Sequence, residues 1–257
     1  MNIQGLQKLT LLDYPDHMAC TIFTGGCNFR CPFCHNGDLV LHPTAHHGVE
    51  TAIPSPTSDT GTSHACQDPW RHSAISHDAL FSFLDKRVGI LDGVCITGGE
   101  PLLQPDLEAL IRDIREMGYL VKLDTNGSFP QKLSALLEKG LLNYVAMDIK
   151  NCPERYRETA GLPDHYDLTP IQDSVKLLMS GDVPYEFRTT IVREYHRPQD
   201  VVSMAQWIAG ASRYYLQGFV QSENVIKLGL HGLDPVEMDA LVPLISPYVP
   251  SVQVRGI

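Results

Sequence analysis

Residues 19–34 read ACTIFTGGCNFRCPFC, and this stretch decides what kind of fold the chain can adopt. Its first part, Ala19–Phe23, is a short apolar run that predicts a buried strand. Gly25 and Gly26 follow it, and adjacent glycines permit a tight turn. Three cysteines then fall within eight positions, too close together to be three core residues of a strand. The stretch therefore predicts a strand that ends in a loop bearing thiols.

Further apolar runs of this length alternate with segments of helical period, such as Leu107–Met117, which Gly118 is expected to end. Repeated strand–helix units predict parallel strands with right-handed crossovers. Six strands are too few for a closed eight-stranded barrel, so we expect an α/β fold, a partial (β/α)6 TIM-like barrel open on one side. A doubly wound sheet is the alternative. The expected strands are Ala19–Phe23, Gly93–Thr97, Leu120–Asp124, Tyr144–Asp148, Tyr185–Ile191 and Tyr214–Phe219.

The C-terminal segment predicts a last strand at Val252–Val254, after an amphipathic helix from Pro235 that Pro243 interrupts. A length of 257 residues suits one domain over residues 1–257. His42–Ile75 breaks the periodic pattern with Ser, Thr, Pro and His, and predicts a flexible loop inserted in that domain. Its histidines and Cys66 lack tight ligand spacing, which favours a solvated loop over a metal site.

Composition excludes several classes of protein. The chain has 20 Lys and Arg against 30 Asp and Glu, a net charge of −10, whereas binding to nucleic acid needs concentrated positive charge. No run approaches the roughly 18 apolar residues of a membrane span, and the first residues show no export signal. Seven cysteines, an odd number with three clustered, do not suit a secreted disulfide framework. We therefore expect a cytoplasmic protein that uses thiolates as ligands.

The clustered cysteines are Cys27, Cys31 and Cys34. A structural zinc site takes four ligands, usually in two pairs, and His35 could complete one here only with awkward geometry. A [4Fe-4S] cluster needs four thiolates to be fully ligated, so three leave one iron open to a cofactor or substrate. We favour the iron–sulfur cluster. A non-catalytic adaptor that holds zinc is the alternative.

The cysteine spacing, with Phe33 before the last cysteine, resembles the radical S-adenosylmethionine (SAM) superfamily. Leu11–Pro15 (LLDYP) followed by Cys27–Asn36 is more narrowly similar to the activating enzymes of glycyl radical enzymes, above all the shorter ones that serve anaerobic ribonucleoside-triphosphate reductase. The resemblance implies one [4Fe-4S] cluster and SAM, whose reductive cleavage yields a 5′-deoxyadenosyl radical that takes hydrogen from a glycine of the partner enzyme. It also implies a flavodoxin- or ferredoxin-like electron donor. A second enzyme alternative keeps these cofactors but takes a small molecule, as 7-carboxy-7-deazaguanine synthase does.

Each later strand ends in a polar motif, and such strand ends build the active site of barrel-like α/β folds. After the second expected strand, Gly98 and Gly99 let the backbone approach a ligand, and Glu100 can accept hydrogen bonds from an ammonium. The resemblance implies that this motif holds the amino group of SAM. Taken alone, the motif is equally typical of a turn that opens a helix.

Arg188 lies among residues suited to a buried strand and so needs an anionic partner, for which we expect the methionine carboxylate of SAM in a bidentate clamp. The resemblance implies that Asp148 and Lys150 contact the ribose and carboxylate of SAM, although a surface ion pair is the simpler alternative. It also implies a monovalent cation beside Asp124, Thr125 and Asp148.

The expected residues divide into two sets, and no side chain is expected to act as acid or base. The cluster ligands are Cys27, Cys31 and Cys34. The cofactor-binding residues are Phe33, Gly98, Gly99, Glu100, Asp124, Thr125, Asn126, Asp148, Lys150, Arg188 and Gln217. The other cysteines, Cys20, Cys95 and Cys152, are expected to be small buried residues.

Overall fold

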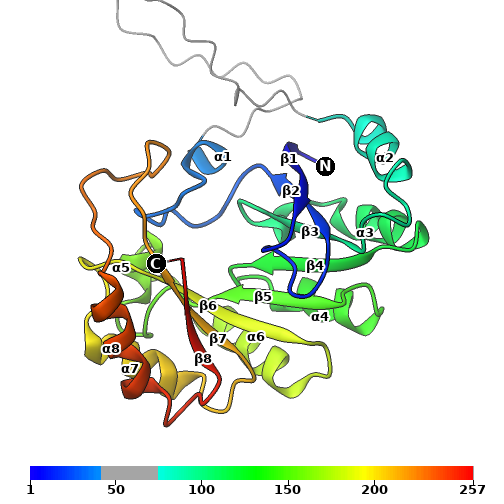
Figure 1. Cartoon of the computed structure of the whole chain (residues 1–257). Coiled ribbons are helices and arrows are strands. Elements are labelled where there is room, and N and C mark those ends of the chain that lie inside the picture. The colour runs from blue at the N-terminus through cyan, green and yellow to red at the C-terminus, as the bar shows by residue number, and fades with distance from the viewer. Residues whose placement is uncertain (42–74, 257) are drawn as a thin grey trace, which may run out of the picture.

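One mainly parallel sheet organises the molecule, and its strand order follows the chain order from β1 to β8. In this computed structural model, which describes residues 1–41 and 75–256, β2 to β8 run parallel and β1 pairs antiparallel with β2. The strands are β1 (Ile3–Thr10), β2 (Ala19–Thr24), β3 (Gly93–Gly98), β4 (Leu120–Thr125), β5 (Tyr144–Asp148), β6 (Tyr185–Ile191), β7 (Tyr214–Gly218) and β8 (Val252–Arg255). Within the described residues β1 and β8 do not pair with each other, so the barrel stays open (Figure 1).

The open partial barrel predicted from the sequence is confirmed, and so are the six expected strands and the last one. The doubly wound alternative is wrong, because the strand order never reverses. Sequence reasoning missed β1, where buried residues are followed by the exposed run Gln7–Leu9 instead of alternating with exposed ones. A strand without alternation carries little sequence signal.

Helices connect the successive parallel strands (Figure 1). Their bounds are α1 (Gly37–Leu41), α2 (His77–Asp85), α3 (Leu107–Glu116), α4 (Pro130–Glu138), α5 (Tyr156–Ala160), α6 (Thr169–Ser180), α7 (Pro198–Trp207) and α8 (Pro235–Ile245), with a 3-10 turn at Pro101–Leu103. Gly118 follows α3 with a positive φ of 93°, as its expected role at the helix end requires. Pro243, expected to interrupt the last helix, lies inside α8, whose buried Met238, Leu241 and Ile245 hold it past the proline.

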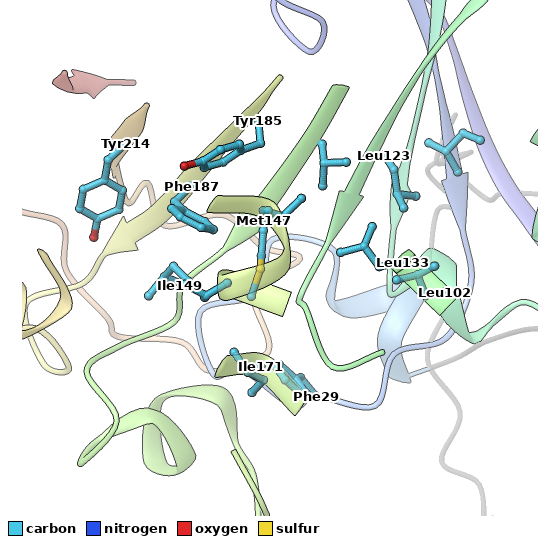
Figure 2. Packing of buried hydrophobic residues seen from close by; sticks show 14 of the residues in the cluster. Phe29, Leu102, Leu123, Leu133, Met147, Ile149, Ile171, Tyr185, Phe187 and Tyr214 are labelled. Carbon is cyan, nitrogen blue, oxygen red and sulfur yellow. The ribbon is translucent and has the colours of Figure 1, made fainter. Parts of the chain in front are cut away.

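The apolar core fills the space between the sheet and these helices. Figure 2 shows Met147 of β5 beside residues from several elements. The backbone of Gly127, with φ at +77°, approaches Met147 so closely that a Cβ there would lie 2.1 Å from its Cε. Burial of each such apolar side chain contributes about 1.5–3 kcal/mol. The core thereby fixes the carboxyl ends of β4 and β5 next to each other.

No helix within the described ranges combines the length and apolar character needed to cross a bilayer. The loop predicted at His42–Ile75 lies outside the described residues except for Ile75, whose N–H donates to Ile3 O at 2.9 Å.

Candidate active site

A pocket of about 410 Å³ lies at the carboxyl ends of β2 to β7. It brings together all the residues predicted for the site except Glu100. The predicted residues that line it are Cys27, Cys31, Phe33, Cys34, Gly98, Gly99, Asp124, Thr125, Asn126, Asp148, Lys150, Arg188 and Gln217. Their convergence follows from the parallel topology, since parallel strands all end at the same edge of the sheet. The individual binding roles stay predictions.

The cysteine loop, residues 25–36, is held by backbone hydrogen bonds to distant segments. The Arg30 N–H donates to Ala160 O of α5 at 3.0 Å, and the Lys227 N–H donates to Pro32 O at 2.8 Å. These bonds reach the loop from α5 and from the connection between β7 and α8. Segments about 130 and 200 residues downstream therefore fix how the thiols are presented.

Gly99 sits directly against the cysteine loop. A Cβ at this position would lie 1.9 Å from Gly26 O, which no side chain can tolerate. The Glu100 N–H donates to the same Gly26 O at 2.8 Å. The glycine after β3 is thus required so that the end of this strand and the thiol loop form one continuous wall of the pocket.

Burial dominates the electrostatics of the three thiols. It raises the pKa of Cys27 to about 11 and of Cys31 to about 12, and it raises the pKa of Cys34. The Phe29 N–H donates to Cys27 Sγ at 3.3 Å and opposes this effect only in part. Raised pKa values favour the protonated thiols near neutral pH, so binding of a metal centre by these cysteines would release their protons.

The zinc alternative finds little support in the side-chain positions. The ring of His35 stacks on Phe219 with centroids 5.3 Å apart, and its Nε2 lies 2.9 Å from Val220 O. Within residues 1–41 and 75–256, no three His, Cys, Asp or Glu side chains gather as closely as a single metal ion requires.

Glu100 lies behind the pocket wall, with no exposed surface. Its carboxylate accepts hydrogen bonds from Leu102 N at 3.0 Å, Thr125 Oγ1 at 2.9 Å and Asn126 N at 2.7 Å. Burial raises its pKa to about 7 in spite of these three donors. In this structure the carboxylate holds Thr125 and Asn126 in place, and its expected contact with a ligand ammonium stays a prediction.

Asn126 connects the end of β4 to the cysteine loop. Its Nδ2 donates to Asn28 Oδ1 at 2.9 Å and approaches Cys27 Sγ at 3.8 Å, while its Oδ1 accepts from Ser128 N at 3.0 Å. The motif Asp124–Gly127 therefore couples the two walls of the pocket.

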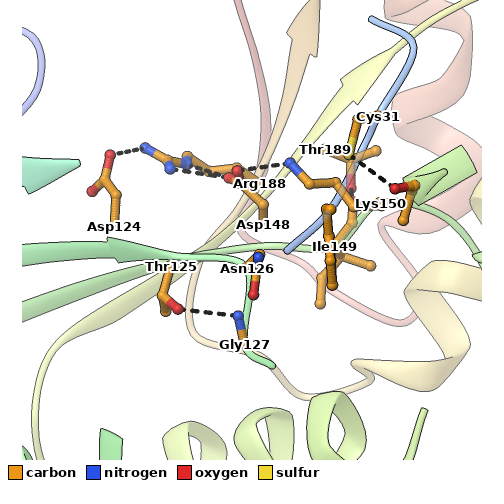
Figure 3. A network of polar contacts seen from close by, with 12 residues as sticks. Cys31, Asp124, Thr125, Asn126, Gly127, Asp148, Ile149, Lys150, Arg188 and Thr189 are labelled. Atoms are coloured by element: carbon orange, nitrogen blue, oxygen red, sulfur yellow. Dashed lines mark hydrogen bonds and ion pairs between the residues drawn. The ribbon is translucent and has the colours of Figure 1, made fainter. Parts of the chain in front are cut away.

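Arg188 links two carboxylates of the chain (Figure 3). Its Nη1 lies 3.0 Å from Asp124 Oδ2, its Nε and Nη2 each lie 3.0 Å from Asp148 Oδ1, and Lys150 Nζ lies 2.9 Å from Asp148 Oδ2. The requirement for an anionic partner is met within the chain by Asp124 and Asp148, and the expected clamp on the methionine carboxylate stays a prediction. The register of β5 and β6, which aligns Asp148 with Arg188, brings about this arrangement.

The charges in this network stabilise one another. Burial alone would raise the pKa of Asp124 and of Asp148, but the neighbouring cations, Arg188 foremost, hold both below their usual range. Burial would lower the pKa of Lys150, but Asp148 holds it above its usual range. Both carboxylates are consequently ionised at neutral pH, and the pair Asp148–Lys150 is partly buried, with side chains 30% and 18% exposed, rather than a surface pair.

Other pocket residues escaped sequence reasoning. Gln7, Asp13 and Thr21 line the pocket from β1, the β1–β2 connection and β2. Asp13 Oδ2 accepts a hydrogen bond from Thr21 Oγ1 at 2.5 Å. Asp13 belongs to the motif at residues 11–15, but it reaches the pocket only because β1 folds back on β2, a hairpin that the sequence pattern does not predict.

The other described cysteines, Cys20, Cys95 and Cys152, are buried as expected and do not line the pocket. Phe33 is also buried, and its ring lies 6.0 Å from that of Tyr195. Cys66 lies outside the described residues.

Comparison with known proteins places these features in a family. The model of the radical SAM superfamily matches residues 21–203. A candidate glycyl-radical enzyme activating enzyme of Methanocaldococcus jannaschii is 29% identical over 220 residues, covering 84% of this chain and 79% of that protein. The 7-carboxy-7-deazaguanine synthase of Synechocystis sp. is 21% identical over 212 residues, covering 82% and 80%. A radical SAM methyltransferase structure from Sphaerobacter thermophilus has a TM-score of 0.67 at 11% identity, covering 96% of this chain and 68% of that one, which is a likeness of fold alone.

Proposed function

The chain belongs to the radical SAM superfamily, and from this membership we propose that it activates a glycyl radical enzyme. The observation that carries the proposal is that one buried and two half-buried thiols share one pocket with a network of paired charges. We propose anaerobic ribonucleoside-triphosphate reductase as the partner, on the resemblance of residues 11–15 and 27–36 to its activating proteins.

Cys27, Cys31 and Cys34 would hold a [4Fe-4S] cluster. The donor set fits, because thiolate sulfur is the ligand that such clusters take and three thiolates leave one iron open. The cluster wall is also structured for the task, since the Phe29 N–H already points to Cys27 Sγ at 3.3 Å. Hydrogen bonds to cluster sulfur are one of the means by which proteins tune the reduction potential.

When bound, the cluster and SAM supply reductive cleavage of SAM to methionine and a radical that takes hydrogen from the substrate. The chain's own residues bind and orient. Gly98 and Gly99 would expose backbone to the amino end of SAM, and Asp148 and Lys150 would contact its ribose and carboxylate. The charge network has three cationic side chains (Lys122, Lys150, Arg188) against two carboxylates, and the excess positive charge favours an anionic ligand group.

Phe33, Gln217 and Asn126 complete the proposed contacts. Phe33 and Gln217 line the pocket from the cysteine loop and from β7, and Asn126 ties β4 to the loop. Glu100 does not line the pocket itself, and it acts by holding Thr125 and Asn126 through hydrogen bonds. No side chain needs to donate or accept a proton.

Activation is favoured over the small-molecule alternative by the comparison of relatives. The candidate activating enzyme and the deazaguanine synthase cover nearly equal shares of this chain, 84% and 82%, but their identities are 29% and 21%. Three further proposals accompany the activity. An electron donor of the flavodoxin or ferredoxin type reduces the cluster, the protein acts in the cytoplasm, and residues 42–75 are an insertion in one catalytic domain.

The proposal is tested by mixing the reduced, cluster-loaded protein with SAM and purified anaerobic ribonucleotide reductase. We expect a glycyl radical signal by electron paramagnetic resonance that depends on SAM and on a low-potential donor. The matched controls are the Cys31→Ala variant of this chain and a reductase whose radical-site glycine is replaced by alanine, neither of which should give the signal.

Two results would contradict the proposal in different ways. Efficient cleavage of SAM without a radical on the reductase would reject the proposed partner and favour a small-molecule substrate. A colourless, zinc-loaded protein that leaves SAM intact would reject both enzyme functions.

A further inference from the structure

Lys122 occupies a position where a strand core normally holds an apolar residue. It lies in the middle of β4 with its side chain 1% exposed. Alternate residues of a strand share a face, so Lys122 points to the same side of β4 as Asp124, two residues nearer the pocket. A fully buried lysine is rare unless its charge is paired with a negative group. The environment of Lys122 must therefore contain such a group.

The ammonium of Lys122 is paired with the carboxylate at the pocket wall. Its Nζ donates to Asp124 Oδ1, lies 3.9 Å from Cys95 Sγ and stands 5.9 Å from the centroid of the Tyr144 ring. The other oxygen of Asp124 is taken by Arg188. Lys122 is therefore a fixed counter-ion directly beneath the pocket.

These contacts bear on the monovalent cation that the family resemblance implies beside Asp124, Thr125 and Asp148. Each carboxylate oxygen of the two aspartates already contacts a lysine or arginine nitrogen. The hydroxyl of Thr125 donates to Glu100 and accepts from Gly127 N. The oxygens that would ligate a mobile cation are thus engaged by the chain itself, and the residues present do not fit such an ion.

Charge counting supports the same reading. Without Lys122, the cations Arg188 and Lys150 would balance Asp124 and Asp148 and leave the network neutral. With Lys122, these ion-paired groups have one positive charge in excess, and Asp13 is a further carboxylate that lines the pocket. A sodium or potassium ion bound at Asp124 would add the same charge. The occupancy of that ion would, however, depend on the salt in the solution.

We propose that Lys122 is a built-in replacement for a monovalent cation, a positioning residue that fixes Asp124 and supplies the excess positive charge for the carboxylate of SAM. The part of this inference that concerns the ligand rests on the proposed function, namely the use of SAM. The part that concerns the pairing of Lys122 with Asp124 does not depend on SAM. The site should therefore work equally well with sodium, potassium or neither.

The first test uses the wild-type protein and needs no variant. SAM binding to the cluster-loaded chain is measured by equilibrium dialysis in choline chloride, sodium chloride and potassium chloride at one ionic strength. We expect the Kd to vary by less than about twofold, a difference of a few tenths of a kcal/mol. A Kd that falls tenfold or more with either alkali cation would overturn the proposal.

The second test uses Lys122→Met, which keeps the length of the side chain but removes its charge. In choline chloride we expect its Kd for SAM to rise roughly tenfold, and sodium or potassium to restore at least half of the loss on a logarithmic scale. Lys139→Met is the matched control, because Lys139 pairs with Glu108 at the surface, with its side chain 49% exposed, and should leave the Kd unchanged. Wild-type affinity of Lys122→Met in choline would contradict the proposal.

A readout on the cluster-free protein separates this inference from the proposed function. We expect the Tm of the wild type to be the same in the three salts, and the Tm of Lys122→Met to lie roughly 10 °C lower and to rise with sodium or potassium. If the wild type binds no SAM, the proposed function fails and these Tm values alone decide the role of Lys122. If Lys122→Met does not fold, Lys122→Arg should fold and retain salt-independent Tm and Kd, and alkali-dependent values would overturn the proposal.

Discussion

The sulfur wall and the charge wall of the pocket are built on opposite principles. On the sulfur wall, Cys27, Cys31 and Cys34 are buried or half-buried thiols whose pKa values are raised mainly by burial. On the charge wall, Asp124 and Asp148 have each oxygen paired with a cation of the chain. The sulfur wall thus presents thiols suited to a thiolate-binding group, whereas the carboxylate oxygens of the charge wall are paired within the chain.

The two walls therefore depend on bound cofactors to different degrees. Chemistry in this family is supplied by the bound groups, and the protein contributes orientation and electrostatics. Changes on the sulfur wall should abolish function while the fold persists. Changes on the charge wall should reduce stability as well as binding, because they leave buried charges without partners.

The largest effect is expected from Cys31→Ala. Loss of one of three thiolates should remove most of the bound iron and reduce SAM cleavage by more than about 100-fold. This loss exceeds the usual effect of replacing a residue that only hydrogen-bonds to a metal ligand. Iron and sulfide analysis after anaerobic reconstitution checks this. Cys20→Ala is the control, since Cys20 is buried in β2 away from the pocket and should keep its iron. If both variants bound equal amounts of iron, Cys31 would not be a ligand of the cluster.

The next largest effect is expected from Asp148→Asn, which deprives Arg188 and Lys150 of a shared partner. We expect the free energy of unfolding of the cluster-free protein to fall by about 3 kcal/mol, the lower end for breaking a buried pair because Asp148 is 30% exposed. Glu108→Gln is the matched control, because Glu108 also meets two cations, Arg112 and Lys139, but at the surface. If the two variants had similar denaturant midpoints, the ion pairs of the charge wall would stabilise the fold no more than surface ion pairs do.

A smaller effect, confined to a pH window, is expected at Glu100. Burial raises its pKa in the folded state to about 7, above the unfolded value, so its protonated form is favoured by folding. The stability it contributes is complete below about pH 4.5 and is lost as the pH rises through about 7. Relative to Glu100→Gln, the wild type should lose up to about 3 kcal/mol across this window. A difference between the two proteins that stays constant from pH 4.5 to 8 in urea unfolding would contradict this.

The smallest effect is expected where the two walls are joined. Asn126→Ala removes the hydrogen bond to Asn28 and the contact with Cys27 Sγ. We expect the free energy of unfolding to fall by about 1–2 kcal/mol, with partial loss of iron on exposure to chelator. Ser180→Ala is the control, because the Ser180 hydroxyl bonds only to exposed helix carbonyls. Asn143 is unsuitable, because its side chain accepts hydrogen bonds from Arg115 and Val121. If Ser180→Ala were as sensitive to chelator as Asn126→Ala, Asn126 would not couple the two walls.

Much of this arrangement could be predicted from the sequence, for physical reasons that differ between elements. The six strands Ala19–Phe23 to Tyr214–Phe219 were predictable because buried parallel strands are continuous apolar runs. The parallel topology then places their polar ends together, and this brought Cys31, Asp124 and Arg188 into one pocket. The strand β1 was not predictable, since its burial does not alternate, and Asp13 was missed with it.

Partners of side chains were harder to predict than their positions. Arg188 was expected to meet a ligand carboxylate, but the register of β5 and β6 places Asp148 beside it. Glu100 was expected to face the pocket, but the turn after Gly99 directs it to Thr125 and Asn126. In both cases a sequence motif specifies which residues reach a strand end, whereas register and turn geometry decide which of them pair within the chain.

The central claim is that the sulfur wall holds an iron–sulfur cluster that acts on SAM. The most direct measurement is anaerobic reconstitution followed by metal analysis and chromatography of the products formed from SAM under reducing conditions. We predict a brown protein with about four irons and about four sulfides per chain, which converts SAM to methionine and 5′-deoxyadenosine. A protein that binds zinc in place of iron, or that leaves SAM intact when its cluster is full and reduced, would contradict the claim.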